Sequence, residues 1–492
     1  MRDVRIVPWA AMIGLALAPV RAQAERPLTY DEALAASVDG NPALRLARYE
    51  VERAEAALVG SRGIFDPTWT ASGSWFQSRE VGYEPTFDVR TLNDASGWNA
   101  RTGINGALAT GTSWQLSGDS SSTLYTTASN GTCTFCPFEF TQTNVDVGID
   151  ASITQSILEG NRLAYNLQNV TLASQALDAA NLQLKRTEQE TLASVATAYW
   201  SWWYQDQLLE LAQDNVAVAA EALRVVELKV ASGDFAPVER TRQEADVVGK
   251  QAELLAAQQA ARRATDDLLL LLGEAPGQDL LPATQPDVAL PQELDGEAAV
   301  RVALAQNLDL LLARQNVDAA ELALSLAKHA TLPSLSATLA GSLGAQDTGF
   351  GGALGALGED LKTPTTTVSA NWSMPLGNRA ARASKDQAAV TTWTRTIELE
   401  QLEGQVSAQV GQQVLQLQSS AQRVALTEAN LRLAEQTLAA EQALADAGRS
   451  IQKDVLEARQ ATEAARVEVA KARTDQQLAL VELMRLQGQL AR

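Results

Sequence analysis

The sequence is internally duplicated, and this restricts the fold more than any single motif does. Residues 28–58, LTYDEALAASVDGNPALRLARYEVERAEAAL, align without a gap on residues 294–324, LDGEAAVRVALAQNLDLLLARQNVDAAELAL. A repeated sequence builds the same supersecondary unit twice. We therefore expect a first structural repeat over 25–293 and a second over 294–492, joined by a Pro-rich linker at 273–293 that is loop or short extra structure.

The duplication continues into two long arms. The motif SILEGNR recurs as SMPLGNR, and each copy precedes a long segment in which alanine and leucine recur at helical spacing. Gly160 and Gly233 are 73 positions apart, and Gly377 and Gly448 are 71 positions apart. A helix of about 70 residues is roughly 105 Å long, so each arm must pack along its whole length.

Each arm ends in a short polar step, after which the helical pattern resumes. These steps predict two long antiparallel helical hairpins, with turns near 231–237 and 446–451. Gly233, Gly448 and Ser450 fall in the turns, where glycine supplies the backbone freedom that a tight reversal needs.

The segments between the paired helices alternate apolar and polar residues. TNVDVGIDASI at 143–153 does so throughout, and SLSATLAGSL at 334–343 and TTVSANWSMP at 366–375 behave similarly. Segments of about ten residues with this period are typical of strands in a membrane β-barrel, and also of an ordinary half-exposed sheet. We expect four barrel strands per chain, two in each repeat, with a long loop at 78–142.

One part of that expected loop has strand character of its own. TGINGALATGTSWQLSG at 102–118 resembles a further hairpin that turns near Thr110 and Gly111. The sequence leaves two alternatives for it, namely an extension of the barrel wall or an external loop.

The N-terminus has the pattern of a secretory signal peptide at 1–24. Arg2 and Arg5 precede an apolar run, and AQA at 22–24 offers a small-x-small cleavage site. After Ala24 no apolar run has the length of about 18 residues that a membrane helix needs. If the mature chain spans a membrane, it must therefore do so as a β-barrel.

Composition excludes several classes of function. The net charge of −20 argues against a nucleic-acid partner, which requires a basic face.

Trp200, Trp202 and Trp203 are expected to be packing residues, and His329, the only histidine, is given no functional role. With no catalytic constellation, metal cluster or phosphate-binding loop in the sequence, we expect no enzyme activity, no cofactor and no metal site.

The only cysteines, Cys133 and Cys136, form the motif CTFC. A Cys-x-x-Cys motif serves redox chemistry or half of a zinc site, but there is no second pair to complete a zinc site. In an exported chain, a small disulfide within a loop is favoured over redox chemistry.

Two acidic residues follow the second turn. Asp454 and Glu457 are three positions apart and so lie on one face of the returning helix, and Glu239 occupies the place in the first repeat that matches Asp454. On the residues alone, Lys453 and Glu457 are a surface pair, and Asp454 is a favourable charge near a helix N-terminus.

Taken together, the opening LTYDEALAASVDGNPALRLAR, its partial copy, the strand-then-GNR junctions and AGRSIQKDVLEARQA resemble the TolC family of outer-membrane efflux and secretion channels. The resemblance covers essentially the whole mature chain, and the lack of a lipidatable cysteine is similar to the non-lipoprotein branch. It implies a homotrimer with a twelve-stranded β-barrel in the outer membrane and a twelve-helix tunnel extending into the periplasm. It also implies a passive duct that is docked by a periplasmic adaptor protein and an inner-membrane transporter.

The resemblance also implies a role for the acidic residues. In the family, carboxylates at the places of Asp454 and Glu457 project into the narrow tunnel entrance, so that a trimer pools six of them, and Glu239 contributes nearby. The sequence departs from the family pattern in the turn, because Ser450 and Ala445 stand where an arginine and a tyrosine act as closing locks.

The alternative is a periplasmic coiled-coil adaptor or structural protein. It shares the signal peptide and the helical hairpins. It does not need two sets of alternating segments at duplicated positions, which favours the channel.

Overall fold

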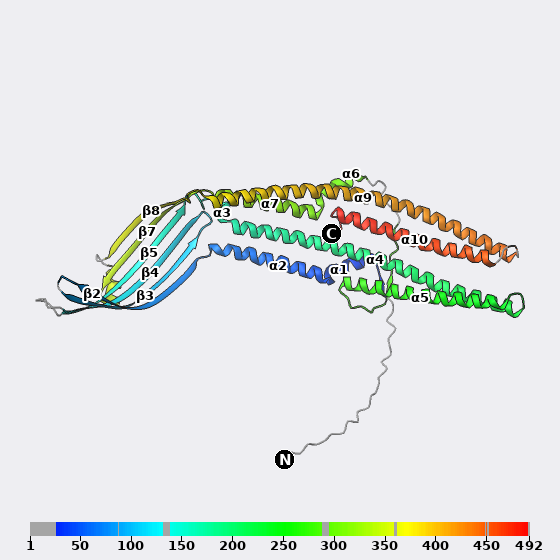
Figure 1. The fold of residues 1–492 in the computed structure, drawn as a ribbon, viewed down its shortest axis with the longest axis horizontal. Helices are drawn as coiled ribbons and strands as arrows, with labels where there is room; N and C mark the ends of the chain where they lie inside the picture. The colour runs from blue at the N-terminus through cyan, green and yellow to red at the C-terminus, as the bar shows by residue number, and fades with distance from the viewer. Residues whose placement is uncertain are drawn as a thin grey trace, which may run out of the picture. The chain divides into compact units, whose positions relative to one another are not determined.

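The computed structural model describes residues 26–86, 88–130, 138–287, 295–358, 362–447, 449 and 452–490. The expected signal peptide, Cys133 and Cys136 therefore lie outside the described residues. The chain forms two compact units, which are described separately; Figure 1 labels their elements. Unit 1 comprises Met1–Arg45, Thr187–Ala303 and Gln409–Arg492, and unit 2 comprises Leu46–Arg186 and Leu304–Ala408.

The duplication is present in the elements themselves. Helices α1 (Tyr30–Gly40) and α2 (Pro42–Arg62) have counterparts of nearly the same length in α6 (Gly296–Gln306) and α7 (Leu308–His329). The asparagine between the two helices acts in both copies. Asn41 Oδ1 accepts a hydrogen bond from Ala43 N at 2.8 Å, and Asn307 Oδ1 accepts from Asp309 N at 3.0 Å. A side-chain oxygen at this place satisfies an N–H group at the start of the second helix.

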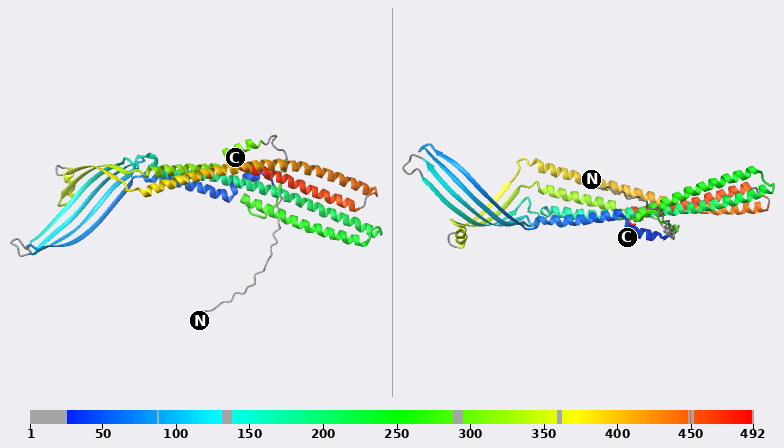
Figure 2. Two further views of the ribbon diagram at one scale, coloured as in Figure 1. Left: turned by 45° about the horizontal axis from the view of Figure 1, so that its top comes forward. Right: turned by 90° about the horizontal axis from the view of Figure 1, so that it is seen from below.

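The expected long hairpins are present. Helix α4 spans Gln168–Ala231 (64 residues) and α9 spans Arg379–Asp446 (68 residues), and each is followed by a shorter helix, α5 (Pro237–Leu272) or α10 (Gln452–Leu486). Figures 1 and 2 show α5 returning along α4, and α10 returning along α9.

Contacts along the second hairpin show that it is antiparallel. Gln413 Nε2 donates to Ala479 O at 2.9 Å, and Thr462 Oγ1 donates to Ala434 O at 3.2 Å. Between these two contacts, the Arg473 guanidinium lies 2.7 Å from the Glu428 carboxylate.

The core of unit 1 lies where an aromatic cluster of α4 meets the start of the chain. Trp200, Trp202 and Trp203 are all buried, as expected for packing residues. Tyr199 Oη donates to Leu28 O at 3.0 Å and accepts from Thr284 N at 3.1 Å. The same contact region contains two short parallel strands, β1 (Arg26–Leu28) and β6 (Leu280–Pro282). Burial here raises the pKa of Tyr30, which stacks on Trp200, to about 12.

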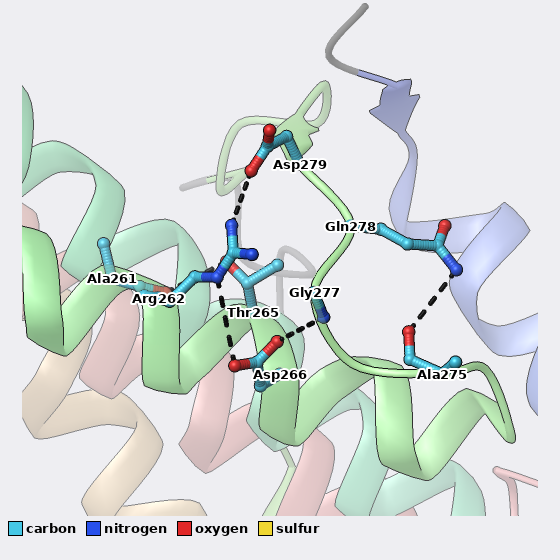
Figure 3. Close-up of polar contacts among 8 residues, drawn as sticks. All are labelled: Ala261, Arg262, Thr265, Asp266, Ala275, Gly277, Gln278 and Asp279. Atoms are coloured by element: carbon cyan, nitrogen blue, oxygen red, sulfur yellow. Dashed lines mark hydrogen bonds and ion pairs between the residues drawn. The ribbon is translucent and has the colours of Figure 1, made fainter. Parts of the chain in front are cut away.

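The described part of the Pro-rich linker is held against α5, as Figure 3 shows. The Arg262 guanidinium contacts the Asp279 carboxylate at 2.5 Å and the Asp266 carboxylate at 4.0 Å. Gly277 N donates to Asp266 Oδ1 at 2.9 Å. The linker thus contains short extra structure, one of the alternatives expected for it.

The described residues of unit 2 form one antiparallel sheet of six strands in the order β2-β3-β4-β5-β7-β8 (Figure 1). The strands are β2 (Thr68–Glu84), β3 (Val89–Ala107), β4 (Thr112–Asn130), β5 (Phe138–Ser156), β7 (Ser334–Asp347) and β8 (Thr363–Ser373). In the described part of the chain, β2 and β8 are the edge strands, with one sheet neighbour each.

This sheet corrects two expectations, the number of strands per chain and the long loop. The loop expected at 78–142 is wrong, because two strands of 19 residues, β3 and β4, occupy most of it. The sheet accordingly has six strands instead of the expected four, with a hairpin turn near Thr110 and Gly111. These strands were missed because serine and threonine take many places on both faces, as in SSSTLYTTAS at 120–129, and this weakens the apolar alternation.

The register gives the sheet two chemically different faces. One is mainly apolar, and it is widely exposed in the single chain, with Trp69 71% and Val368 79% exposed. It carries Trp69, Trp75, Trp98, Ile104, Trp114, Leu116, Ile149, Ile153, Leu339, Leu343, Val368 and Trp372. The opposite face carries mainly hydroxyl, amide and carboxylate groups, including those of Thr70, Ser72, Asn99, Ser117, Asp150, Thr338 and Ser369.

Short helices complete unit 2: α3 (Leu163–Asn166), α8 (Phe350–Ala356) and a 3-10 turn at Gly63–Phe65. Ala353 of α8 packs on Val145 and Val147 of β5. None of the helices in the described part of the chain has a stretch long and apolar enough to cross a membrane.

His329, for which no functional role is expected from the sequence, is buried at the end of α7. Its Nε2 accepts a hydrogen bond from Gly160 N at 3.2 Å, and its ring contacts Tyr165 edge-on. Since the ring is buried and Arg162 is nearby, the pKa of His329 lies below its usual value.

Candidate functional site: the two hairpin turns

The turn between α4 and α5 is a Schellman motif. Gly233 has φ +87°, Asp234 N donates to Lys229 O at 2.9 Å, and Gly233 N donates to Val230 O at 3.1 Å. These two bonds satisfy the last carbonyl groups of α4, and the left-handed backbone at their centre favours glycine. Gly233, which the sequence predicts in this turn, has a left-handed backbone.

Local contacts then close the first turn. Ser232 Oγ donates to Asp234 Oδ2 at 2.8 Å, and the Lys229 ammonium lies 4.9 Å from the centre of the Phe235 ring. Pro237 begins α5, where its missing N–H is not needed.

The second turn repeats part of this pattern. Gly448 and Ser450 lie outside the described residues. Arg449 N donates to Leu444 O at 2.8 Å, and these residues are five positions apart, as are Asp234 and Lys229. Both α4 and α9 thus end with a hydrogen bond that reaches back five residues.

Asp454 and Glu457 lie near the N-terminus of α10. Asp454 is in the first turn of the helix and half-buried, whereas Glu457 is exposed on the next turn. The positive end of the helix dipole stabilises carboxylates at this place. Both residues therefore lie in the first two turns of α10.

Glu239 has a different environment, although it occupies the place that matches Asp454. Its carboxylate accepts a hydrogen bond from Arg242 Nη1 at 2.8 Å, and both side chains are exposed. Arg242 in turn occupies the place that matches Glu457, so the first repeat has opposite charges where the second has two negative ones. Arg242 is not among the residues predicted from the sequence, although an alignment of the two turns reveals it.

A second charged group farther along the hairpins was also missed. Glu463 of α10 is half-buried, and burial raises the pKa of its carboxyl. Asp246 and Glu253 of α5 raise this pKa further, while Lys250 and Arg459 lower it. Three carboxyl groups and two cationic side chains therefore lie within electrostatic range of one another in this part of the hairpins.

No group of three or more His, Cys, Asp or Glu side chains within the described ranges is placed to hold a metal ion.

A protein-family model described as "Outer membrane efflux protein" matches residues 110–274 and 299–489. A curated relative from Pseudomonas aeruginosa, the pyoverdine export outer membrane protein OpmQ, is 25% identical over 241 residues, which cover 49% of this chain and 48% of that protein. OpmQ of Pseudomonas putida is 26% identical over 253 residues, covering 51% and 50%. The chain thus matches about half the length of these curated relatives.

Solved structures share the fold. The outer membrane protein VceC of Vibrio cholerae matches with a TM-score of 0.64 at 15% identity, covering 93% of this chain and 96% of VceC. The open state of the MtrE outer membrane channel of Neisseria gonorrhoeae matches with a TM-score of 0.64 at 17% identity, covering 94% and 90%.

Proposed function

Because the chain belongs to the outer membrane efflux protein family, we propose that it is the exit duct of a tripartite efflux or type I secretion system. The family assignment agrees with the TolC resemblance of the sequence. In this role the protein lies in the outer membrane with its helices in the periplasm, and it performs no catalysis.

The two-faced sheet is the observation that carries this proposal. An exposed apolar face of this extent needs a covering, and acyl chains of the outer membrane supply one. The opposite face, rich in hydroxyl and carboxylate groups, suits a water-filled passage. In this proposal the uncovered edges of β2 and β8 pair with those of neighbouring copies in a homotrimer, which removes the edges altogether.

The helical hairpins supply the remaining contacts of the proposed duct. Their turns are the places at which a periplasmic adaptor protein and an inner-membrane transporter engage the trimer. Cargo then enters the duct at the turns and leaves through the interior of the closed sheet.

We further propose that Asp454 and Glu457 form the entrance of the duct. Three copies pool six carboxylates, a ring that concentrates cations, repels anions and binds a multivalent cation. The contribution of Glu239 is reduced, because the Arg242 guanidinium offsets its charge.

The test is single-channel conductance of the mature protein in a planar bilayer, with a trivalent cation titrated from the side of the turns. We expect a small, cation-selective conductance that the trivalent cation blocks. Asp454→Asn/Glu457→Gln is expected to abolish the block. Glu468→Gln/Glu482→Gln, which removes two carboxylates elsewhere on α10, is the matched control and should keep it.

The outcomes separate the two parts of the proposal. Block that survives in Asp454→Asn/Glu457→Gln contradicts the entrance and leaves the duct. Absence of conductance, also in variants loosened around Gly448, contradicts the duct and favours a periplasmic adaptor.

A further inference from the structure

The hairpin of β3 and β4 is an integral part of the sheet. β3 pairs with the whole length of β2, from Thr68 opposite Asn105 to Glu84 opposite Val89. β4 pairs with β5 from Thr112 opposite Gln155 to Ser129 opposite Phe138. An external loop would leave β2 beside β5, whereas two full-length strands separate them here.

The turn of this hairpin is bonded to the end of the sheet where α3 begins. Ser156 N donates to Gly111 O at 3.1 Å, and Asn166 Nδ2 donates to Ala109 O at 3.0 Å. Gly111 has φ +78°, and a Cβ atom there would lie 2.1 Å from Gly160 O. The hairpin therefore runs from one end of the sheet to the other.

The hairpin also continues both faces of the sheet. Trp98 of β3 and Trp114 of β4 lie on the same face as Ile153 and Leu339. On the polar face, Arg101 Nη2 of β3 donates to Ser117 Oγ of β4 at 3.0 Å and lies 3.4 Å from the Asp150 carboxylate of β5. This ion pair links three adjacent strands.

We propose that the β3–β4 hairpin is part of the wall of the duct, so that the closed sheet of the trimer has eighteen strands, six from each chain. This inference rests on the proposed function, and it replaces the twelve strands that the family resemblance implies. An inserted hairpin adds two strands, so the directions of β2 and β5 and their junctions with the helices are preserved. Since the diameter of a closed sheet grows roughly linearly with its number of strands, the passage is about 1.5 times as wide.

The two strand numbers predict different distances between chains. With strands about 4.8 Å apart and tilted by about 40°, a closed sheet is about 24 Å across with twelve strands and about 36 Å across with eighteen. Equivalent backbone positions in three symmetric chains are then separated by about 21 Å or about 31 Å.

The experiment measures this distance by pulsed electron paramagnetic resonance between nitroxide labels. The single label is attached at Val368→Cys on the edge strand β8, in the mature chain with Cys133→Ser and Cys136→Ser. A second variant also lacks residues 85–130, so that residues 131–137 join β2 to β5. A label at Leu433→Cys on α9 is the control, since it reports the trimer independently of the sheet.

The side chain of residue 368 lies on the apolar face, so the nitroxide stands outside the backbone and lengthens the measured distance equally for either strand number. We therefore expect a decrease of about 10 Å at position 368 in the deletion variant, while the distance at position 433 stays the same. If the deletion variant does not fold, a label at Ser369→Cys on the opposite face is measured as well, and the mean of the two full-length distances gives the backbone separation, about 31 Å for eighteen strands. An unchanged distance in a folded deletion variant, or a mean near 21 Å with the trimer distance present at position 433, overturns the eighteen-stranded wall and leaves the duct. Absence of an interchain distance at both positions overturns the trimer and this inference with it.

Discussion

The two repeats of this chain agree closely in their helices and differ in their strands. In the residues that the structure describes, the first repeat has four strands between α2 and α4, whereas the second has two between α7 and α9. The helices of the long hairpins differ by only a few residues, with 64 and 36 in the first repeat against 68 and 35 in the second. Helix lengths that must match along a shared packing surface are thus conserved between the copies, while the sheet accepts a whole hairpin.

A second difference lies in the charges that follow the turns. The first repeat pairs Glu239 with Arg242, and the second has Asp454 and Glu457 at the matching places. The repeats share the geometry of the reversal, including a hydrogen bond over five residues, but differ in the chemistry presented there. In the proposed duct only the second repeat supplies strong negative charge to the entrance.

The largest expected effect concerns the buried side chains of the long helices. Trp202 in the first repeat and Leu417 in the second have corresponding positions and are both almost completely buried. We expect Trp202→Ala to lower the free energy of unfolding by about 3–5 kcal/mol, and Leu417→Ala by about 2–5 kcal/mol. Denaturant unfolding followed by circular dichroism measures both. A loss below about 2 kcal/mol for Trp202→Ala would contradict the aromatic cluster as the main core of unit 1.

The next prediction tests the extra hairpin of the first repeat. Gly111→Ala places a Cβ against Gly160 O at a left-handed residue, which we expect to cost about 1–3 kcal/mol. Gly341→Ala in β7 of the second repeat meets nothing within 4 Å and should change stability by less than about 0.5 kcal/mol. Melting temperatures of both variants in detergent measure the two effects. Equal melting temperatures would contradict the close packing of the turn at Gly111 against Gly160.

Exchanging the charges sharpens the comparison of the turns. Glu457→Arg gives the second repeat the charges of the first, and we expect block by the trivalent cation to weaken several-fold, since three carboxylates become three cations in the trimer. Arg242→Glu does the reverse and should strengthen the block. Bilayer conductance measures both variants, and an unchanged block in each would remove the turns from the entrance.

The smallest expected effect is a pH dependence that only the second repeat supplies, since Gly63 is the counterpart of His329. The pKa of folded His329 is below the usual value of about 6.5, so the unfolded chain binds a proton more readily. The stabilisation contributed by neutral His329 is therefore complete above pH about 6.5. It decreases as the pH falls from this value toward the lower pKa of the folded chain. Melting temperatures between pH 7.5 and pH 5 should show a slope that is reduced in His329→Gln. An equal slope in that variant would assign the effect to carboxyl groups.

Much of this architecture can be predicted from the sequence, because helical periodicity persists over dozens of residues and occurs in both repeats. The reversal at Gly233 is predictable for a local reason, since a left-handed residue at a helix end favours glycine. β3 and β4 were missed as full strands because Ser120 and Ser122 occupy places on the apolar face. Their pairing depends on neighbours contributed by other segments, which a local pattern does not contain. The charge difference made by Glu239 and Arg242 can be predicted only by comparing the sequences of the two turns.

The parallel pair of β1 and β6 has a consequence for the order in which the protein folds. Arg26 pairs opposite Leu280, and Tyr199 connects Leu28 with Thr284. β1 thus precedes its partner β6 by some 250 residues in the chain. Contacts of such large sequence separation form slowly, because a long loop must close before they are made. β1 therefore remains unpaired until α4, α5 and β6, which follow it in the chain, are available. Completion of unit 1 is thus a late event in the folding of this protein.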